Sequence, residues 1–172
     1  VPSDILVESI GLLAGALGLS TSVPQILRMR QLGSSQGVSR VTWLMTYASG
    51  SSWLAYGVRT ASVPNVLANA VAIALTGWLL AVLLAQHRWR WGLVLLLPPV
   101  VAVVVLRIPE AAMTALLLTF SFTWWPQAAK VLSAWKDGAP VKAVSLTTWL
   151  LALGSASLWL TYALLTGRTV PA

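Results

Sequence analysis

The sequence predicts an all-α integral membrane protein in which two related three-helix units are joined by a linker helix. Three observations lead to this fold class. Hydrophobic residues make up 58% of the 172 residues and charged residues only 9%, whereas about 25% of the residues of a soluble domain are charged. The few charges leave long apolar runs between them. The order of residues in the first half of the chain also recurs in the second half.

The apolar runs predict six membrane spans. A helix needs about 20 residues to cross the hydrocarbon core of a bilayer. The runs show no polar face at helical period, which a core helix of a soluble protein would need. The run with Pro98-Pro99 is the shortest. The charge-free runs cover residues 9–27, 41–58, 60–86, 91–106, 111–129 and 143–167.

The net charge of +7 is distributed as a topology signal. Basic residues follow the first, third and fifth spans: Arg28, Arg30, Arg40, Arg88, Arg90, Lys130, Lys136 and Lys142. The opposite loops carry only Arg59, Arg107 and Arg168. The positive-inside rule therefore predicts a multi-pass protein of the cell membrane with its N-terminus outside and these three loops in the cytoplasm. The same distribution argues against a nucleic-acid partner.

Two stretches of the first half recur in the second half. TSVPQILR (21–28) matches TWWPQAAK (123–130) at an offset of 102, and VSRVTWLMTYASGSSWLAYGV (38–58) matches VSLTTWLLALGSASLWLTYAL (144–164) at an offset of 106. The prediction is a first repeat at 1–88, a linker helix at 89–108 and a second repeat at 109–172. A three-span repeat would insert upside down without the linker, so the two repeats are expected to be parallel.

The motifs resemble the PQ-loop superfamily, and most closely the SWEET and semiSWEET sugar transporters. The residues that carry the resemblance are the Glu-x-x-Gly from Glu8, the Pro24-Gln25 pair, the WLAYG that ends at Gly57 and the Pro-x-x-x-Ala-Asn that ends at Asn69. The resemblance implies two parallel PQ-loop bundles and alternating access. It also implies a seventh span beginning at Pro171, which matches Pro64. We expect either that the chain continues beyond Ala172 or that a second copy completes the bundle in a homo-oligomer.

Enzymatic chemistry is not predicted. Four carboxylates, one histidine and no cysteine leave no set of catalytic residues, no metal site and no cofactor site. His87 is interpreted as an interfacial residue beside Arg88.

Trp53 and Asn69 are the predicted substrate-binding residues. Trp53 lies six residues before Arg59 and Asn69 six residues after Val63, which places both about 9 Å below the outer interface. An indole face and an amide suit a sugar ring and its hydroxyls, and the resembled family lines its pocket with this pair. Trp159 is the counterpart of Trp53 in the second repeat. The alternatives are an aromatic-belt role for Trp53 and an interhelical hydrogen bond for Asn69.

The two Pro-Gln pairs, Pro24-Gln25 and Pro126-Gln127, are predicted to form the inner hinge. Proline frees the carbonyl one turn earlier and allows the helix to bend, and the glutamines can bond the freed backbone or the facing helix. The alternative is a static kink.

An outer gate is predicted at the opposite end of the spans. Its candidate residues are Glu8, Glu110, Tyr56 and Tyr162, with Arg59 or Arg107 as the cation. The alternative is that the two acids are solvated residues favoured by a helix N-terminus.

The predicted function is passive transport of a small neutral solute, most simply a sugar. No carboxylate lies inside a span, although a proton-coupled carrier usually keeps one there. The partners expected are the lipid bilayer and the solute. The alternatives are a carrier of an amino acid or another metabolite, and a membrane receptor or scaffold that transports nothing.

Overall fold

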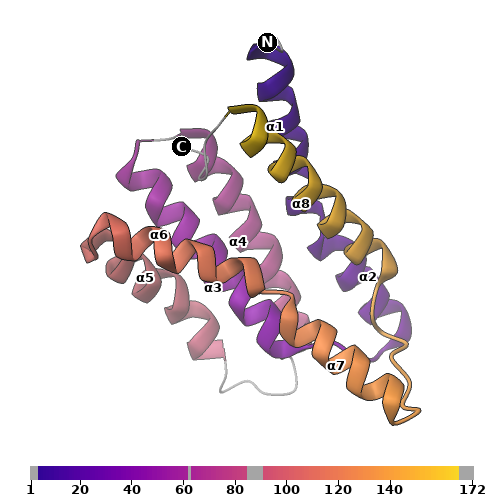
Figure 1. The fold of residues 1–172 in the computed structure, drawn as a ribbon. Helices are drawn as coiled ribbons and strands as arrows, with labels where there is room; N and C mark the ends of the chain where they lie inside the picture. Colours follow the sequence, from indigo (N-terminus) through magenta and orange to yellow (C-terminus); the bar gives the residue numbers. More distant parts are fainter. Residues whose placement is uncertain (1–3, 62, 85–90, 167–172) are drawn as a thin grey trace.

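A computed structural model describes residues 4–61, 63–84 and 91–166 (Figure 1). Within these ranges the chain is all-helical, as predicted. In chain order the elements are α1 (Asp4–Ser20), α2 (Ser22–Leu32), α3 (Arg40–Arg59), α4 (Val63–Leu83), α5 (Trp91–Arg107), α6 (Glu110–Thr119), the 3₁₀ turn η2 (Phe120–Phe122), α7 (Trp125–Lys136) and α8 (Leu146–Thr166).

Both runs that contain a Pro-Gln pair are broken just before the proline. The first is divided at Thr21, between α1 and α2, because Pro24 has no N–H and its ring would clash with the carbonyl of Ser20. The hydroxyl of Thr21 donates to the carbonyl of Gly18 at 2.7 Å, so the break does not leave that oxygen unpaired. In the second run the turn η2 precedes Pro126, which lies in the first turn of α7.

The helices α3 and α4 form a tight antiparallel pair. Gly50 and Gly57 of α3 face α4, and a Cβ atom built on Gly57 would lie 3.1 Å from the backbone nitrogen of Val66. A side chain at position 57 would therefore push the two helices apart, whereas a Cβ atom at position 50 would make an ordinary contact with Ile73. The linker helix α5 packs against α3 on another side.

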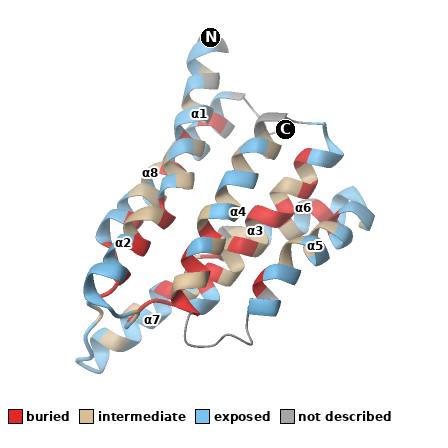
Figure 2. Cartoon of the chain, turned by 180° about the vertical axis from the view of Figure 1, so that it is seen from behind, coloured by how far each residue is buried: buried red, intermediate tan, exposed pale blue. Residues whose placement is uncertain are grey.

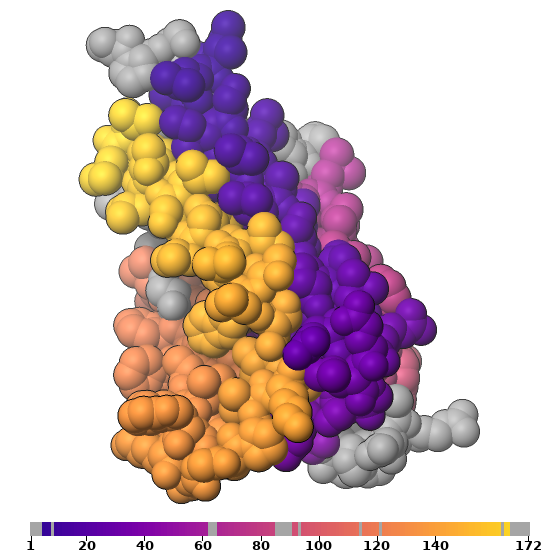
Figure 3. All heavy atoms as spheres, turned by 90° about the vertical axis from the view of Figure 1, so that its right-hand side faces the viewer, coloured from indigo at the N-terminus to yellow at the C-terminus, as the bar shows by residue number. Residues whose placement is uncertain are grey.

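The two halves of the chain pack on each other along two seams. In the first seam, α1 and α2 contact α8; in the second, α6, η2 and α7 contact α3. Figure 3 shows α8 in yellow lying along α1 in indigo. The main cluster of buried residues lies where α2, α3 and the C-terminal part of α4 pack together, and much of the outer surface of α5 and α8 is exposed (Figure 2).

Two helical stretches among the described residues are long and apolar enough to cross a bilayer. They are Ile5–Leu32, which includes α1 and α2, and Asn65–Leu83. The apolar stretches Val94–Arg107 and Glu110–Thr119 are shorter than a full span. The number of six spans predicted from the charge-free runs therefore stays a prediction.

Candidate functional site

The glutamine of the first Pro-Gln pair holds the start of α8. Gln25 is buried, and its Nε2 donates to the carbonyl of Ala143 at 2.6 Å. Its Oε1 accepts from the backbone N–H of Ser145 at 3.1 Å. A single side chain of the first repeat thus pairs two backbone groups of the second repeat.

The glutamine of the second pair makes the equivalent contacts from the second repeat to the first. The Nε2 of Gln127 donates to the carbonyl of Gly37 at 2.8 Å, and its Oε1 accepts from the N–H of Ser39 at 2.6 Å. Gln25 and Gln127 are related by the offset of 102, and their partners by the offset of 106. The contacts therefore recur at the two spacings that the sequence comparison identified.

Each glutamine completes a helix cap that a serine of the other repeat begins. The hydroxyl of Ser39 accepts from the N–H of Thr42, and that of Ser145 from the N–H of Thr148, both at 3.2 Å. In a capping box, a Glu or Gln three residues into the helix bonds the N–H of the cap residue. Here that position is a threonine, and the glutamine comes from the other repeat. We call the two arrangements the Gln25 cap and the Gln127 cap.

The two caps differ in one hydrogen bond. The hydroxyl of Thr148 donates to the carbonyl of Thr21 at 2.9 Å, which adds a contact to the Gln25 cap. The equivalent hydroxyl of Thr42 is buried and has no partner. The difference arises at the break in the helix: Thr21 follows α1 directly, whereas its counterpart Thr123 follows the turn η2.

Three tryptophans meet between the two caps. The ring of Trp124 lies 5.6 Å from the rings of both Trp43 and Trp149, which are repeat equivalents. The sequence did not predict that these three rings would meet. The recurrence of Val-Ser-x-x-Thr-Trp was the signal that could have identified the caps and this cluster together.

The predicted binding tryptophans lie in matching aromatic pairs. Trp53 meets Tyr56 edge to face at 5.7 Å, and Trp159 meets Tyr162 in the same way at 5.7 Å. Trp53 is half-buried, whereas Trp159 is 37% exposed. The two tyrosines proposed for the outer gate are thus neighbours of the two binding tryptophans.

Asn69 lies on the part of α4 that packs against α3. Gly57 packs against Val66 at one end of the contact, and Gly50 packs against Ile73 at the other. Position 69 lies about midway between the two contact points, as position 53 does on α3. The amide of Asn69, however, donates within its own helix, to the carbonyl of Asn65 at 2.9 Å and to its Oδ1 at 2.5 Å.

Two hollows of the described part of the chain are considered, and neither is lined by Trp53, Asn69 or Trp159. The first is lined by the apolar residues Met45, Phe122, Trp125 and Pro126. The second is lined by the loop before α3 and by Lys130, with the residues Ser35, Gln36, Gly37, Val38, Ser39, Arg40, Val41 and Lys130. The predicted substrate site therefore stays a prediction.

The predicted outer gate is described only in part. The side chain of Glu8 lies outside the described residues, as do His87 and Pro171. Glu110 is exposed in the first turn of α6. Arg59 donates from Nη1 to the carbonyl of Ile108 at 2.8 Å, so this cation is bonded to the end of the linker segment.

The chain matches no protein-family profile, no curated protein and no solved structure.

Proposed function

We propose that the protein is a membrane-embedded facilitator that carries a small neutral solute, most simply a sugar, by alternating access between two parallel PQ-loop-like repeats. The observation that carries the proposal is the pair of reciprocal caps. Each repeat holds the start of a helix in the other through a glutamine that follows a helix break. Movement at the two helix breaks would release both caps together and open the end of the molecule at which the caps lie.

The character of the surface supports a membrane location. Large apolar side chains are exposed along several helices, among them Ile5, Leu12, Leu95, Leu146 and Leu164. Soluble monomers rarely expose contiguous apolar patches of more than a few hundred Å², whereas lipid tails would cover such side chains at no cost. In the proposed orientation, the caps lie at the cytoplasmic end.

The charges support the same orientation. Arg28, Arg40 and Lys130 all lie at or beside the caps, and Arg28 donates from Nε to the carbonyl of Lys142 at 3.1 Å. Glu110 and Arg59 lie at the other ends of their helices. Because the chain has no cysteine, single cysteines at positions 35 and 60 can be labelled from either side of the membrane without background. Labelling of both from the same side would contradict the orientation.

Uptake into proteoliposomes tests the function. The full-length protein is assayed with a labelled monosaccharide and a labelled disaccharide, with unlabelled sugars and amino acids as competitors. We expect sugars to compete and Trp53→Ala to lower uptake about tenfold, which corresponds to a loss of about 1.4 kcal/mol of binding. Asn69→Ala should also lower uptake. Trp135→Ala is the matched control, because Trp135 is a highly exposed tryptophan far from the predicted site.

Three results would count against the proposal. Competition by amino acids alone would assign another solute to the same fold. Equal uptake by wild type, Trp53→Ala and Asn69→Ala would remove the site assignment. Binding of a solute without exchange across the membrane would replace the facilitator with a receptor.

A further inference from the structure

Two hollows lie one above the other along the second seam. The apolar hollow has a volume of about 420 Å³ and the polar hollow a volume of about 550 Å³. Met45 of the apolar hollow is four residues from Val41 of the polar one, and Pro126 is four residues from Lys130. Residues four apart share one face of a helix. The two hollows are therefore separated by about one helical turn along the contact of α3 with α7.

The apolar hollow is suited to a hydrocarbon chain. Met45, Phe122, Trp125 and Pro126 line it, and no polar side chain is among them. Phe122 is 68% exposed and Trp125 is 72% exposed, although both are large aromatic residues. In a bilayer these rings would face the acyl chains of lipids rather than water.

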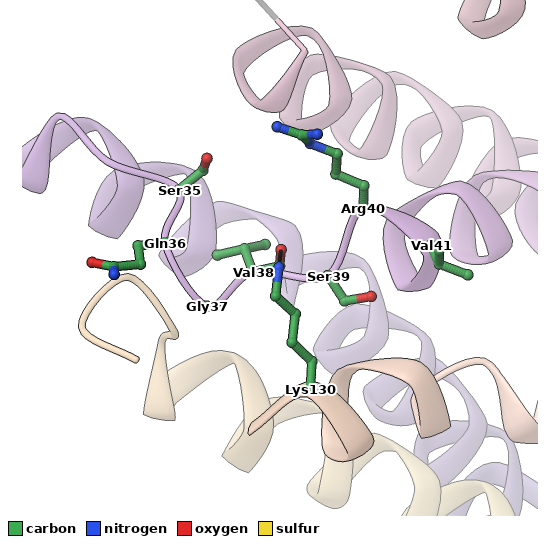
Figure 4. A pocket seen from close by; sticks show the side chains of 8 residues that line it. All are labelled: Ser35, Gln36, Gly37, Val38, Ser39, Arg40, Val41 and Lys130. Atoms are coloured by element: carbon green, nitrogen blue, oxygen red, sulfur yellow. Dashed lines mark hydrogen bonds between the residues drawn. The ribbon is translucent and has the colours of Figure 1, made fainter. Parts of the chain in front are cut away.

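The polar hollow carries positive charge without a carboxylate. Figure 4 shows Lys130 reaching from α7 to the loop before α3, where its Nζ donates to the carbonyl of Val38 at 2.8 Å. Arg40 extends from the other side of the loop and adds a second cation. Burial, and then the charge of Arg40, lower the pKa of Lys130 below the ordinary lysine value. An anion beside Lys130 would relieve this cost.

We propose that the second seam binds one anionic phospholipid of the cytoplasmic leaflet, with an acyl chain against Met45, Phe122 and Trp125 and the phosphate beside Lys130 and Arg40. The positive N-terminal end of α3 favours the phosphate at the same place. A free phosphate would use only the polar hollow, and the apolar hollow one helical turn away therefore favours a lipid. The inference rests on the proposed membrane location, and it assigns a lipid that contacts both repeats beside the Gln127 cap.

The test measures lipid binding to the full-length protein by native mass spectrometry in a neutral detergent. Dioleoyl phosphatidylglycerol, dioleoyl phosphatidylcholine and inorganic phosphate are titrated separately. We expect phosphatidylglycerol to bind most tightly. Lys130→Gln should weaken its binding about fivefold, the value of one interfacial charge, and Lys130→Arg should preserve it. Trp125→Ala should weaken the binding of both lipids.

Arg28→Gln is the matched control. Arg28 is the repeat equivalent of Lys130 and also donates to a loop carbonyl. Its replacement therefore tests whether any basic residue beside a cap contributes equally to lipid binding. We expect less than a twofold change. An equal loss in Arg28→Gln, equal binding of the two lipids, or displacement of phosphatidylglycerol by inorganic phosphate would each overturn the proposal.

The same experiment separates this site from the proposed transport function. No solute is present in the lipid titration. Lipid binding that depends on Lys130, found together with an absence of sugar uptake, would therefore refute the facilitator and leave the lipid site standing.

Discussion

The two seams between the repeats are built from equivalent positions but are packed differently. In the first seam, α1 presents Gly11 and Gly18 to α8. A Cβ atom on Gly11 would lie 3.1 Å from the ring of Tyr162, and one on Gly18 would lie 3.0 Å from the hydroxyl of Ser155. That hydroxyl donates to the carbonyl of Ala14 at 2.8 Å. Small residues therefore bring the two backbones close together.

The second seam has large residues where the first has glycine. At the offset of 102, the counterparts of Gly11, Gly15 and Gly18 are Met113, Leu117 and Phe120. Met113 and Leu117 are buried in a cluster with Ala55 of α3 and Val105 of α5, so bulky side chains fill the outer part of this seam. Its inner part contains the two hollows.

The comparison shows how a duplicated unit becomes asymmetric without losing its symmetric contacts. In both caps the glutamine keeps the same two backbone partners in type and spacing, because each glutamine satisfies buried groups that would be costly to leave unpaired. The helix faces outside the caps can differ in sequence between the two seams. Close contact at glycines in the first seam and packed methionine and leucine side chains in the second both exclude solvent from the interface. The looser seam is the one to which we assign the lipid.

The largest effect is expected from Gln127→Leu, which removes the cap of the second seam. The carbonyl of Gly37 and the N–H of Ser39 would both be left buried and unpaired, and we expect a loss of about 3 kcal/mol of unfolding free energy. Gln25→Leu should cost less, about 2 kcal/mol, because the bond from Thr148 to Thr21 still holds the first seam. Unfolding followed by helical circular dichroism in detergent measures both.

Gln31→Leu serves as the control for these two variants, because Gln31 is an exposed glutamine of the same helix as Gln25. It should change stability by less than about 0.5 kcal/mol. A Gln25→Leu variant as unstable as Gln127→Leu would show that the additional threonine bond contributes nothing to the first seam.

A smaller loss is expected when the first seam is given a residue of the second. Gly11→Met places a long side chain against the ring of Tyr162, and overpacking of this kind costs about 2 kcal/mol. Gly15→Leu makes the corresponding exchange at a position where a Cβ atom meets nothing within 4 Å. It should be neutral or stabilising in the same unfolding assay. Equal destabilisation by the two variants would mean that close approach does not define this seam.

Much of the helical framework could be predicted from the sequence, because helix-forming apolar runs and proline breaks are local properties of the chain. The helices α3, α4 and α5 begin within three residues of the charge-free runs that start at 41, 60 and 91. The positions of the two Pro-Gln pairs also predicted where the helices would break, although each break lies a few residues before its proline rather than at it.

The partners of the polar side chains could not be predicted in the same way. The sequence offered each glutamine its own freed backbone or a facing helix, and nothing in the spacing showed that the partner would be the cap residue of the other repeat. Asn69 was expected to point into a binding site. Its amide bonds Asn65 because a partner four residues away on the same helix face is always within reach. An argument from depth alone does not include this competition between a local partner and a ligand.

The smallest and most discriminating effect concerns Thr148 and Thr42, which occupy the same position in the two caps. Thr148→Val removes a hydroxyl that donates to Thr21, so about 1 kcal/mol of stability should be lost. Thr42→Val removes a buried hydroxyl that has no partner, and valine has almost the same shape. Since the cost of burying an unpaired polar group disappears with it, we expect Thr42→Val to be neutral or stabilising by up to about 1 kcal/mol. The sign of the difference in stability between the two valine variants shows whether the Thr42 hydroxyl is unpaired. If Thr42→Val is the more destabilising change, this hydroxyl has a hydrogen-bond partner, and the second seam is packed more closely than the first comparison implies.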